Sequence, residues 1–434
     1  MLPLKSPLRT ILSLLPALAY ASDGVHYSSS AGRKVCTVNA NGGNQSDVTN
    51  ILTAFDTCGK GGDIIFPETE NYWIDRKLNP VVDDVRIQWR GIWTFSPDLE
   101  YWRANHYPIA FQNHGASFVL TGGHIQIDGY GTGGIHGNGD VWYTAEAGDT
   151  QPGRPMPFVF WNVSDVTVKK FFVKDPPLWS VNIMNGTDMW FDELHCNATA
   201  TRAPYGSNWV QNTDGFDTMD AHNIRLTNFV YQGGDDCIAI KSRSYNVFVQ
   251  NATCRGGNGM AIGSLGQYLE DNTVENIVID DVKIIRYNED MHNSAYIKTW
   301  VGELVPQPDS YESAYVPRGG GWGSVRNILF SNFLVHGADA GPSITQNNGA
   351  LKNGTYSGTS LMGISNVAFV NFTGYLNNKQ KTASVGCSTV HPCYNIEYDN
   401  VTLTVAEHST STGSSSCSYV SPGGVHGLSG SGCG

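Results

Sequence analysis

The chain has 434 residues, which is enough for a large core in one extended domain or in about two to three compact ones. Its formal net charge is -12 and no basic patch is visible, which argues against nucleic acid as a partner because phosphate binding needs clustered Lys and Arg. Gly is abundant at 49 residues, aromatic residues reach 11%, and short runs rich in Val, Ile, Phe and Thr indicate an all-β protein.

The first segment of the chain has the pattern of a secretory signal peptide. Residues 1–21 carry Lys5 and Arg9, then an apolar run over 11–19, and end on small residues around Ala21, after which we expect cleavage. The run is too short for a membrane span, and no later stretch approaches the ~20 apolar residues that a transmembrane helix needs. We therefore expect a secreted, extracellular protein with no membrane partner.

Sequons of the type Asn-x-Ser/Thr are frequent, as expected for a chain that meets glycosyltransferases during export. We expect N-glycosylation on surface loops at these positions. The sequon asparagines are Asn44, Asn162, Asn185, Asn197, Asn251, Asn353, Asn371 and Asn400.

The nine cysteines suit an oxidising compartment. The sequence holds no Cys-x-x-Cys pair and no cluster of His, so we expect no zinc site and no cofactor. Spacing alone does not determine the pairing, and pairing of near neighbours leaves Cys196 over. The local possibilities are Cys36 with Cys58, Cys237 with Cys254, Cys387 with Cys393, and Cys417 with Cys433.

A short pattern recurs along the chain: an Asn or Asp, then alternating apolar residues, then another Asn or Asp. The alternation predicts strands with one buried face, and intervals of roughly 23 to 50 residues predict one structural unit per repeat. Irregular spacing favours a right-handed parallel β-helix over a β-sandwich or propeller, and stacked coils let Asn side chains hydrogen-bond along the stack. Clear copies begin at His222, Tyr245, Glu275, Arg326, Ser365 and Tyr394, with weaker copies from Ser164 and Thr187.

The repeats leave no domain boundary inside the array. We expect one β-helix catalytic domain over 22–434, in which the residues up to about 60 cap the first coil. The Ser/Gly-rich segment from about His408 is predicted to be a loose tail, and we expect the protein to be a monomer.

The acidic residues concentrate at two neighbouring positions of the repeat. Asp214 lies 21 residues before Asp235, and Asn258 follows Asp235 after 23 residues, so each step is one coil. Equivalent positions on successive coils stack about 4.8 Å apart, so we expect the carboxylates of Asp214, Asp235 and Asp236 to converge. Asp220 belongs more naturally to the turn that follows.

The concentration of aspartates in these segments has three possible explanations. Like charges within ~5 Å raise one another's pKa, and a protonated carboxyl beside an ionised one can hydrolyse a glycosidic bond. The alternatives are turn formation, since Asp-Gly and Gly-Gly-Asp are ordinary turn sequences, and a calcium site.

A lysine follows the cluster in the sequence "AYIKTWVG", where Lys298 alternates with Tyr296 on one side of a strand. A single Lys on a strand is most often solvated surface. Beside the carboxylates it would instead supply the cation that an acidic sugar needs.

Together, "NTDGFD", "GGDDC", "GGNGMAIGSLGQY" and "YIKTW" resemble, in this order and spacing, the polygalacturonases of glycoside hydrolase family 28. The resemblance covers about 36–405 and implies a right-handed parallel β-helix, no metal, and inverting hydrolysis of α-1,4 bonds to galacturonic acid. By motif, it implies Asp235 as proton donor, Asp214 and Asp236 as the carboxylates that activate water, and the disulfide Cys237–Cys254. The expected substrate-binding residues are Asn212, Asn258, Tyr296 and Lys298. Of the other local cysteine pairs, we also expect Cys387–Cys393 to form a disulfide.

Two positions depart from the family pattern. Asn258 stands where the family usually has His, and it neither takes nor gives a proton. Tyr296 stands where the family usually has Arg, which removes a bidentate grip on a carboxylate. These variants look like the exo-acting branch, which releases terminal galacturonic acid from 1,4-α-galacturonan or, as the alternative, from rhamnogalacturonan.

Further alternatives are a calcium-dependent pectate lyase and a non-catalytic wall-binding β-helix. The aromatic-rich stretch 89–107 either walls off one end of an exo-acting cleft or packs in the core near a cap. In each case the expected partner is an acidic pectic polysaccharide, homogalacturonan or rhamnogalacturonan.

Overall fold

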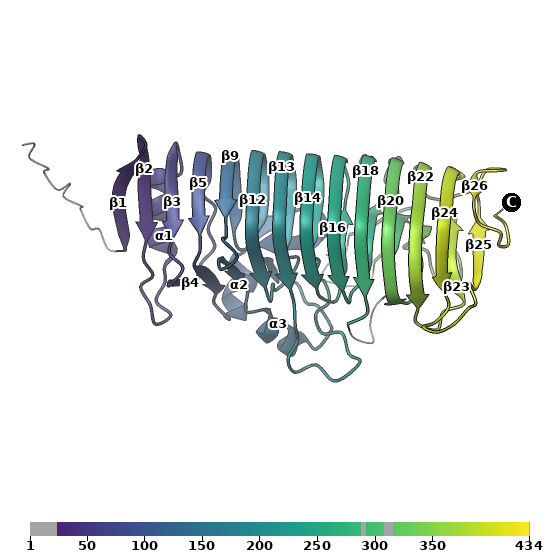
Figure 1. Cartoon of the computed structure of the whole chain (residues 1–434), viewed down its shortest axis with the longest axis horizontal. Coiled ribbons are helices and arrows are strands. Elements are labelled where there is room, and N and C mark those ends of the chain that lie inside the picture. Colours follow the sequence, from purple (N-terminus) through teal and green to yellow (C-terminus); the bar gives the residue numbers. More distant parts are fainter. Residues whose placement is uncertain (1–23, 288–291, 308–315, 434) are drawn as a thin grey trace, which may run out of the picture.

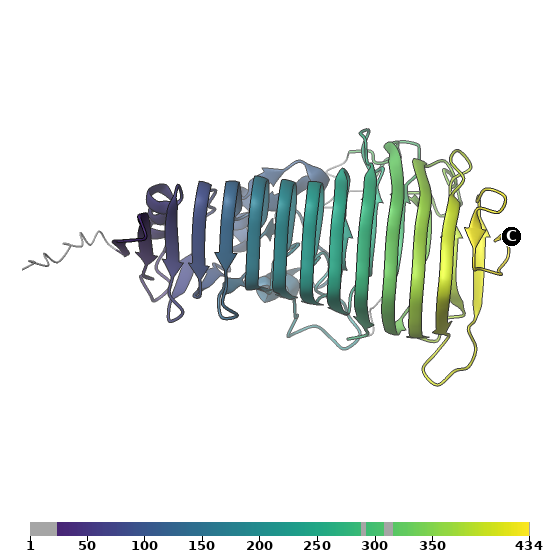
Figure 2. The same ribbon diagram turned by 45° about the horizontal axis from the view of Figure 1, so that its top comes forward.

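A computed structural model describes residues 24–287, 292–307 and 316–433; the expected signal peptide lies outside them. The chain winds into a long stack of coils, shown in two orientations in Figure 1 and Figure 2. Neighbouring strands are parallel and in register, so that Val181 pairs with Phe216, Phe216 with Ile238, and Ile238 with Met260. The predicted parallel β-helix is confirmed.

Three rows of strands form the sides of the coil. The front row carries the acidic segments, and several long strands bend from it into the second row. The front row contains β12 (Val159–Lys174), β13 (Val181–Asn197), β14 (Phe216–Gln232), β15 (Asp236–Ile240), β17 (Gly259–Leu265), β19 (Ala295–Trp300), β21 (Ser343–Asn348), β23 (Lys381–Gly386) and β25 (Ser414–Ser418).

The second row continues through the long strands and runs the whole length of the stack. A third row begins with short strands in the N-terminal coils and continues through the C-terminal ends of the long strands. The second row adds β2 (Arg33–Val38), β3 (Gly62–Phe66), β5 (Val81–Trp89), β9 (Val119–Asp128), β16 (Ser244–Arg255), β18 (Val274–Ile285), β20 (Trp322–Ala338), β22 (Leu361–Leu376), β24 (Tyr394–Thr404) and β26 (Val425–His426); the third row adds β4 (Asn71–Ile74), β6 (Ile92–Phe95) and β10 (Gly134–His136).

An asparagine ladder runs along one corner of the stack. Each side-chain amide donates to the side-chain oxygen of the Asn on the preceding coil at 2.7–3.3 Å. The backbone turns the corner in the left-handed region at each rung, with φ between 53° and 60°, a conformation that Asn tolerates better than most residues. The rungs are the second residues of the predicted repeats: Asn223, Asn246, Asn276, Asn327, Asn366 and Asn395.

Both ends of the stack are closed. At the N-terminal end β1 (Val25–Ser30) pairs antiparallel with β2, and α1 (Val48–Cys58) covers the coil interior. At the other end the segment from about 408, expected to be loose, differs from that expectation. Its β25 pairs with β23 because the coil pattern continues, and a disulfide holds it.

The four local cysteine pairings are all present as disulfides. Cys196 is buried and free. Their sequence separations are only 22, 17, 6 and 16 residues, so each disulfide links neighbouring chain segments within one or two coils.

An insertion made of two segments, one between β6 and β9 and one between β10 and β12, leaves the coil and lies against the outside of the front row. Its three-stranded sheet packs on Trp179, Met184 and Met219, which point outward from the front row. It is built from α2 (Leu99–Asn105), β7 (Tyr107–Ile109), η1 (Phe111–Asn113), β8 (His114–Ala116), α3 (Gly139–Glu146) and β11 (Pro155–Met156).

The aromatic-rich stretch 89–107 divides between the two expected roles. Trp89, Trp93 and Trp102 are at most 1% exposed and pack in the core, so most of the stretch is core packing. The wall against the front row is made by the residues that follow, at 107–116.

Candidate active site

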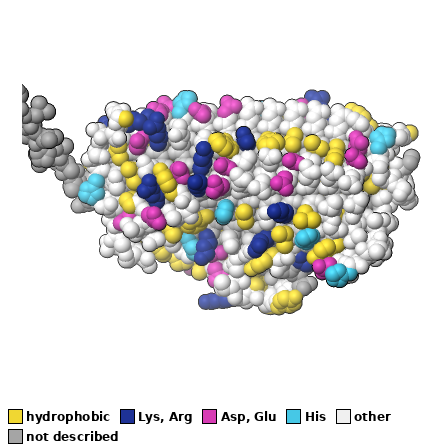
Figure 3. All heavy atoms as spheres, viewed as in Figure 1, with side chains coloured by type: hydrophobic (Ala, Val, Ile, Leu, Met, Phe, Trp, Pro, Cys, Tyr) yellow, Lys and Arg dark blue, Asp and Glu magenta, His cyan; other side chains and the backbone are white. Residues whose placement is uncertain are grey.

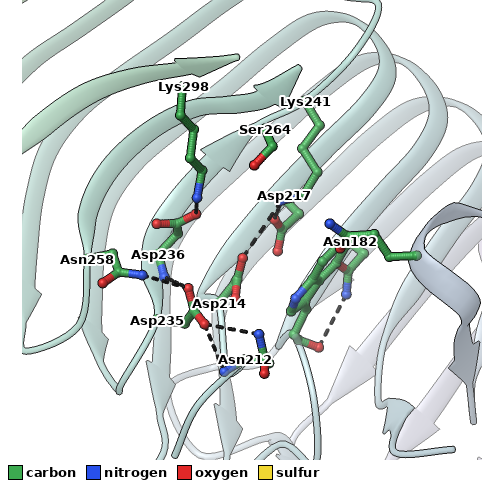
Figure 4. A network of polar contacts seen from close by, with 12 residues as sticks. Asn182, Asn212, Asp214, Asp217, Asp235, Asp236, Lys241, Asn258, Ser264 and Lys298 are labelled. Atoms are coloured by element: carbon green, nitrogen blue, oxygen red, sulfur yellow. Dashed lines mark hydrogen bonds and ion pairs between the residues drawn. The ribbon is translucent and has the colours of Figure 1, made fainter. Parts of the chain in front are cut away.

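The register of the front row brings the acidic segments together. Asp214 lies just before β14, Asp235 and Asp236 lie at the start of β15, and Asn258 lies just before β17. One oxygen each of Asp214, Asp235 and Asp236 lies within 4.8 Å of the others, and Figure 4 shows the three side chains converging. The predicted convergence is confirmed.

Asp235 is held by amide donors. Its Oδ2 accepts from the backbone N–H of Asn212 at 2.9 Å and the side chain of Asn212 at 3.2 Å. Its Oδ1 accepts from the side chain of Asn258 and the N–H of Asp236, both at 2.9 Å. Burial and the charge of Asp236 raise the pKa of Asp235 to about 6, so the carboxyl keeps its proton in mildly acidic solution.

Asp236 is held by the two residues of the fourth motif. Lys298 Nζ lies 2.8 Å from Asp236 Oδ2, and the hydroxyl of Tyr296 donates to Asp236 Oδ1. Lys298 also donates to the Tyr296 hydroxyl at 3.0 Å, which confirms that the two side chains share one face of the strand. Burial alone would lower the pKa of Lys298, but the carboxylates of Asp236 and Asp235 outweigh it and raise the pKa.

A second lysine, which the sequence reading did not single out, lies on the other side of the cluster. Lys241 Nζ is 3.1 Å from Asp217 Oδ1 and 3.9 Å from Asp214 Oδ2, and it lies 4.3 Å from the ring centre of Trp179. Its sequence signal is a charged residue that ends the apolar run "CIAIK", two positions after Ala239 on the same strand face.

Burial dominates the titration of the remaining two carboxyls. It raises the pKa of Asp217 to about 7, with Lys241 opposing the shift, and raises the pKa of Asp214 well above its ordinary value, with Asp217 and Asp235 adding to the effect. Asp214 Oδ1 is buried and has no hydrogen-bond partner among the described residues. An oxygen in this state is suited to hold a water molecule.

The two lysines divide the four aspartates unequally. Lys298 pairs with Asp236, and Lys241 pairs with Asp217 and, at longer range, Asp214. Within the part of the chain that the structure describes, Asp235 has no ion pair. The arrangement therefore separates one carboxyl suited to donate a proton from a neighbouring carboxylate that is already neutralised.

The three converging oxygens also have the geometry of a hard-cation site. The positive charge is already supplied there, because the ammonium groups of Lys298 and Lys241 lie within 4 Å of the same carboxylates. A divalent ion would be repelled by both lysines, so the donor set fits a calcium ion poorly.

The insertion reaches along the front row to the loop after β17. The side-chain amide of Gln112 donates to Gln267 Oε1 at 3.0 Å, and the N–H of Gln112 donates to the Tyr268 hydroxyl at 3.1 Å. His114 packs edge-on against Trp179 with ring centres 4.3 Å apart. We call these contacts the wall.

Beyond the cluster the front row continues with β21. The next outward residues in register after Tyr296 and Lys298 are Ser343 and Thr345 of β21, and both are half-buried. Near the wall, Gln267 Nε2 is buried with no hydrogen-bond partner in the described segments of the chain. The contacts of the wall therefore hold a side chain that still has an unsatisfied polar group.

Comparison with known proteins agrees with this geometry. Residues 62–427 match the family model described as Glycosyl hydrolases family 28. The chain belongs to glycoside hydrolase family 28. It is therefore a glycoside hydrolase, as the four motifs predict.

Individual members of family 28 are similar over nearly the whole chain. A protein from Aspergillus niger named galacturan 1,4-alpha-galacturonidase C is 68% identical over 418 residues, covering 96% of this chain and 98% of its own length. A protein of the same name from Neosartorya fischeri is 62% identical, covering 91% of this chain and 93% of its own.

Solved structures share the fold at low identity. The endo-xylogalacturonan hydrolase from Aspergillus tubingensis superposes with a TM-score of 0.75 at 24% identity, covering 92% of this chain and 100% of that one. Endopolygalacturonase I from Stereum purpureum superposes with a TM-score of 0.62 at 18% identity, covering 91% of this chain and 99% of that one. The fold is thus the right-handed parallel β-helix of these family 28 enzymes.

The sequon asparagines lie on the surface. Asn371 is half-buried, and the other seven are exposed. The disulfide Cys237–Cys254 joins β15 to β16 directly after Asp236, and thereby anchors the strand that carries the two central carboxyls.

Proposed function

We propose that the protein is a secreted, exo-acting hydrolase that releases terminal galacturonic acid from 1,4-α-galacturonan. The relatives named galacturan 1,4-alpha-galacturonidase support the substrate. The observation that supports the exo mode is the wall, because the bond between Gln112 and Gln267 ties the insertion to the loop after β17, and we infer that this insertion blocks one end of the substrate path. A polymer can then place only its terminal residue across the cluster.

In the proposed reaction Asp235 protonates the glycosidic oxygen as the bond to the anomeric carbon breaks. Asp236 and Asp214 hold the attacking water, and Asp236 takes its proton. Lys298, fixed by Asp236 at 2.8 Å, lies where a further N–H can meet the substrate carboxylate. Tyr296 and Asn258 act through the catalytic carboxyls that they contact, rather than as free groups awaiting substrate.

Inversion at the anomeric carbon is part of the proposal. The nearest carboxyl oxygens lie within 4.8 Å, closer than the roughly 6.5–9.5 Å typical of inverting pairs. A water held between Asp214 and Asp236, opposite the proton donor, would still invert the product. NMR of the first-formed galacturonic acid, before mutarotation, decides between the two stereochemical outcomes.

The substrate is tested by chromatography of products from polygalacturonate and from rhamnogalacturonan. Galacturonic acid as the sole early product of polygalacturonate is expected, and the Asp235→Asn variant should release none while still binding oligogalacturonate. A ladder of intermediate oligomers would exclude the exo mode. Near-normal turnover by Asp235→Asn would exclude its role as proton donor.

Rhamnogalacturonan is the second candidate substrate. Tyr296 stands where the family usually has a cationic Arg, and its hydroxyl donates to Asp236. Among the described residues, Lys298 is therefore the cation on that side of the cluster. A site with one cation suits a terminal galacturonate followed by an uncharged rhamnose. Faster release from rhamnogalacturonan than from polygalacturonate would favour this substrate.

The lyase alternative makes a separate prediction. Calcium-dependent elimination gives unsaturated products that absorb in the ultraviolet, whereas the lysine-neutralised cluster predicts hydrolysis that a chelator leaves unchanged. A non-catalytic role in binding the plant cell wall is excluded once the wild type releases galacturonic acid.

Secretion is supported by the pattern of residues 1–21, by the four disulfides and by the exposed sequons. No helix in the described part of the chain is long and apolar enough to cross a membrane. Expression of the full chain in a fungal host, followed by assay of medium and cells, tests it; activity retained inside the cells would contradict secretion.

A further inference from the structure

A cavity of about 580 Å³ lies outside the wall, at the corner where the front row turns into the second row. Its volume falls within the roughly 300–1,000 Å³ of ordinary ligand pockets. Its apolar surface comes from Phe111, Trp161, Met184, Met219 and Tyr268, and Asp214, Asp235 and Asp236 do not line it. The cavity is therefore separate from the catalytic cluster.

The polar rim does not suit an acidic sugar. Arg243 lines the cavity together with Asp220 and Glu270, and it donates to Asp220 Oδ2 at 3.1 Å and lies 3.3 Å from Glu270. One positive charge thus faces two negative charges. Galacturonate would be repelled, whereas an uncharged pyranose would find both hydrogen-bonding groups and apolar surface.

A predicted glycosylation site, which would attach such a pyranose covalently, lies at the edge of the cavity. Asn185 lines it, is exposed, and forms the sequon Asn185-Gly186-Thr187. The ring of Trp161, 41% exposed, lies on the neighbouring coil in register with Met184. An exposed indole beside a sequon offers the flat apolar surface on which the face of a sugar ring packs.

We propose that this cavity holds the first sugars of the chain's own N-linked glycan on Asn185. The inference rests on the proposed secretion, which supplies the donor, a lipid-diphosphate-linked oligosaccharide. Asn185 Nδ2 bonds to the anomeric carbon, the bond from that carbon to the lipid diphosphate breaks, and Nδ2 loses one proton. The remaining Nδ2 hydrogen keeps the contact with Asn162 Oδ1, 3.4 Å away.

The same contact implies that Asn162, itself a sequon residue, is not modified together with Asn185. The two asparagines occupy the same corner on adjacent coils, which stack about 4.8 Å apart. We expect two branched glycans rooted at that spacing to exclude one another. Asn162 does not line the cavity, so the glycan on Asn185 is the one that gains the apolar contact.

Glycopeptide mapping of the protein secreted from a fungal host gives the first test. We expect Asn185 to be occupied, and the occupancies of Asn162 and Asn185 to sum to no more than one. Asn353, whose surrounding residues 351–355 are all exposed, serves as the reference site. An unmodified Asn185 in a protein modified at Asn353 would overturn the inference. Absence of glycan at every sequon would instead refute the secretory route, and the inference with it.

The rate of glycan removal from the native protein gives the second test. An endoglycosidase should release the Asn185 glycan about tenfold more slowly than the Asn353 glycan, a ratio equivalent to ~1.4 kcal/mol. Trp161→Ala should bring the two rates together, and Trp161→Phe should keep most of the difference. Equal rates in the wild type would overturn the proposal. Thermal unfolding of each variant made without glycans in bacteria controls for folding, which an exposed side chain should affect little.

Discussion

The carboxyls of the acidic cluster differ in the residues that contact them. Asp235 receives four hydrogen bonds and no ion pair from the described residues, whereas Asp236 receives an ammonium group and a phenol. Asn258 is part of this division, because its amide donates to Asp235, the proposed proton donor. An amide can only stabilise the ionised form of a carboxyl in this orientation, so it tunes the acid without sharing its proton.

Asn258→Leu tests that tuning. Loss of the donor favours the protonated form of Asp235 and raises its pKa from about 6. Since the acid must be protonated to act, the alkaline limb of kcat/KM should move upward by roughly 0.5–1 pH unit, as expected for a hydrogen bond worth about 1 kcal/mol. Ser264→Ala, in the same groove without contact to Asp235, should leave that limb in place. A downward shift in Asn258→Leu would contradict the assignment.

At the scale of elements, the repeated parts of the structure follow from the sequence and the inserted parts do not. The period-2 strands, the asparagine rungs and the convergence of Asp214 with Asp235 depend on spacings of one coil, which the sequence displays directly. The wall joins Gln112 to Gln267 across 155 positions, and no repeat relates them. Lys241 was missed for a similar reason, because only the packing of Trp179 and Asp217 around it shows that it faces the site.

Opening the wall should change the product pattern. Gln112→Ala and Gln267→Ala each remove the 3.0 Å bond that holds the insertion to the loop after β17. With hexagalacturonate, each variant should release dimer and trimer in addition to monomer. Because both substitutions break one contact, the double variant should add little to either single one, as a double-mutant cycle would show. Exclusive release of monomer by the double variant would contradict the role of the wall.

A rung of the asparagine ladder should matter for stability rather than activity. Asn276 donates to Asn246, accepts from Asn327, and has a φ of 60°. Asn276→Ala should lower the free energy of unfolding by about 1–3 kcal/mol, from the lost hydrogen bonds and the strained backbone. Asn276→Gly relieves the strain alone and should lose less. If both variants lose the same free energy of unfolding in urea, the left-handed backbone conformation contributes nothing to the loss of stability in Asn276→Ala.

Over the whole molecule, burial of several carboxyls makes stability depend on pH in an unusual direction. The folded-state pKa is raised to about 6 for Asp235 and about 7 for Asp217, against the ordinary 3.8. The folded protein therefore binds more protons than the unfolded chain between about pH 4 and 7, and stability falls as pH rises through that window.

This dependence is measurable as Tm, which should be higher at pH 4.5 than at pH 7.5. Asp235→Asn removes one of the titrating groups and should flatten the decline. A wild-type Tm that rises across the same interval would show that the cluster is ionised in the folded state. On the face shown in Figure 3, acidic and basic side chains are interspersed.

The covered ends of the stack bear on whether one molecule can add to another through its strand edges. A parallel coil presents unpaired strand edges at both ends, and each edge is a template on which another chain can add. The antiparallel strand β1 and helix α1 cover one edge. At the other edge the last residues return over β25, through the bridge from Ser416 to Ser431 and the disulfide Cys417–Cys433. Without these closures the same hydrogen-bonding pattern would propagate from molecule to molecule as a fibre. With them, growth of the sheet stops at the chain's own ends, and the asparagine ladder that could run indefinitely through a filament is limited to one discrete catalyst.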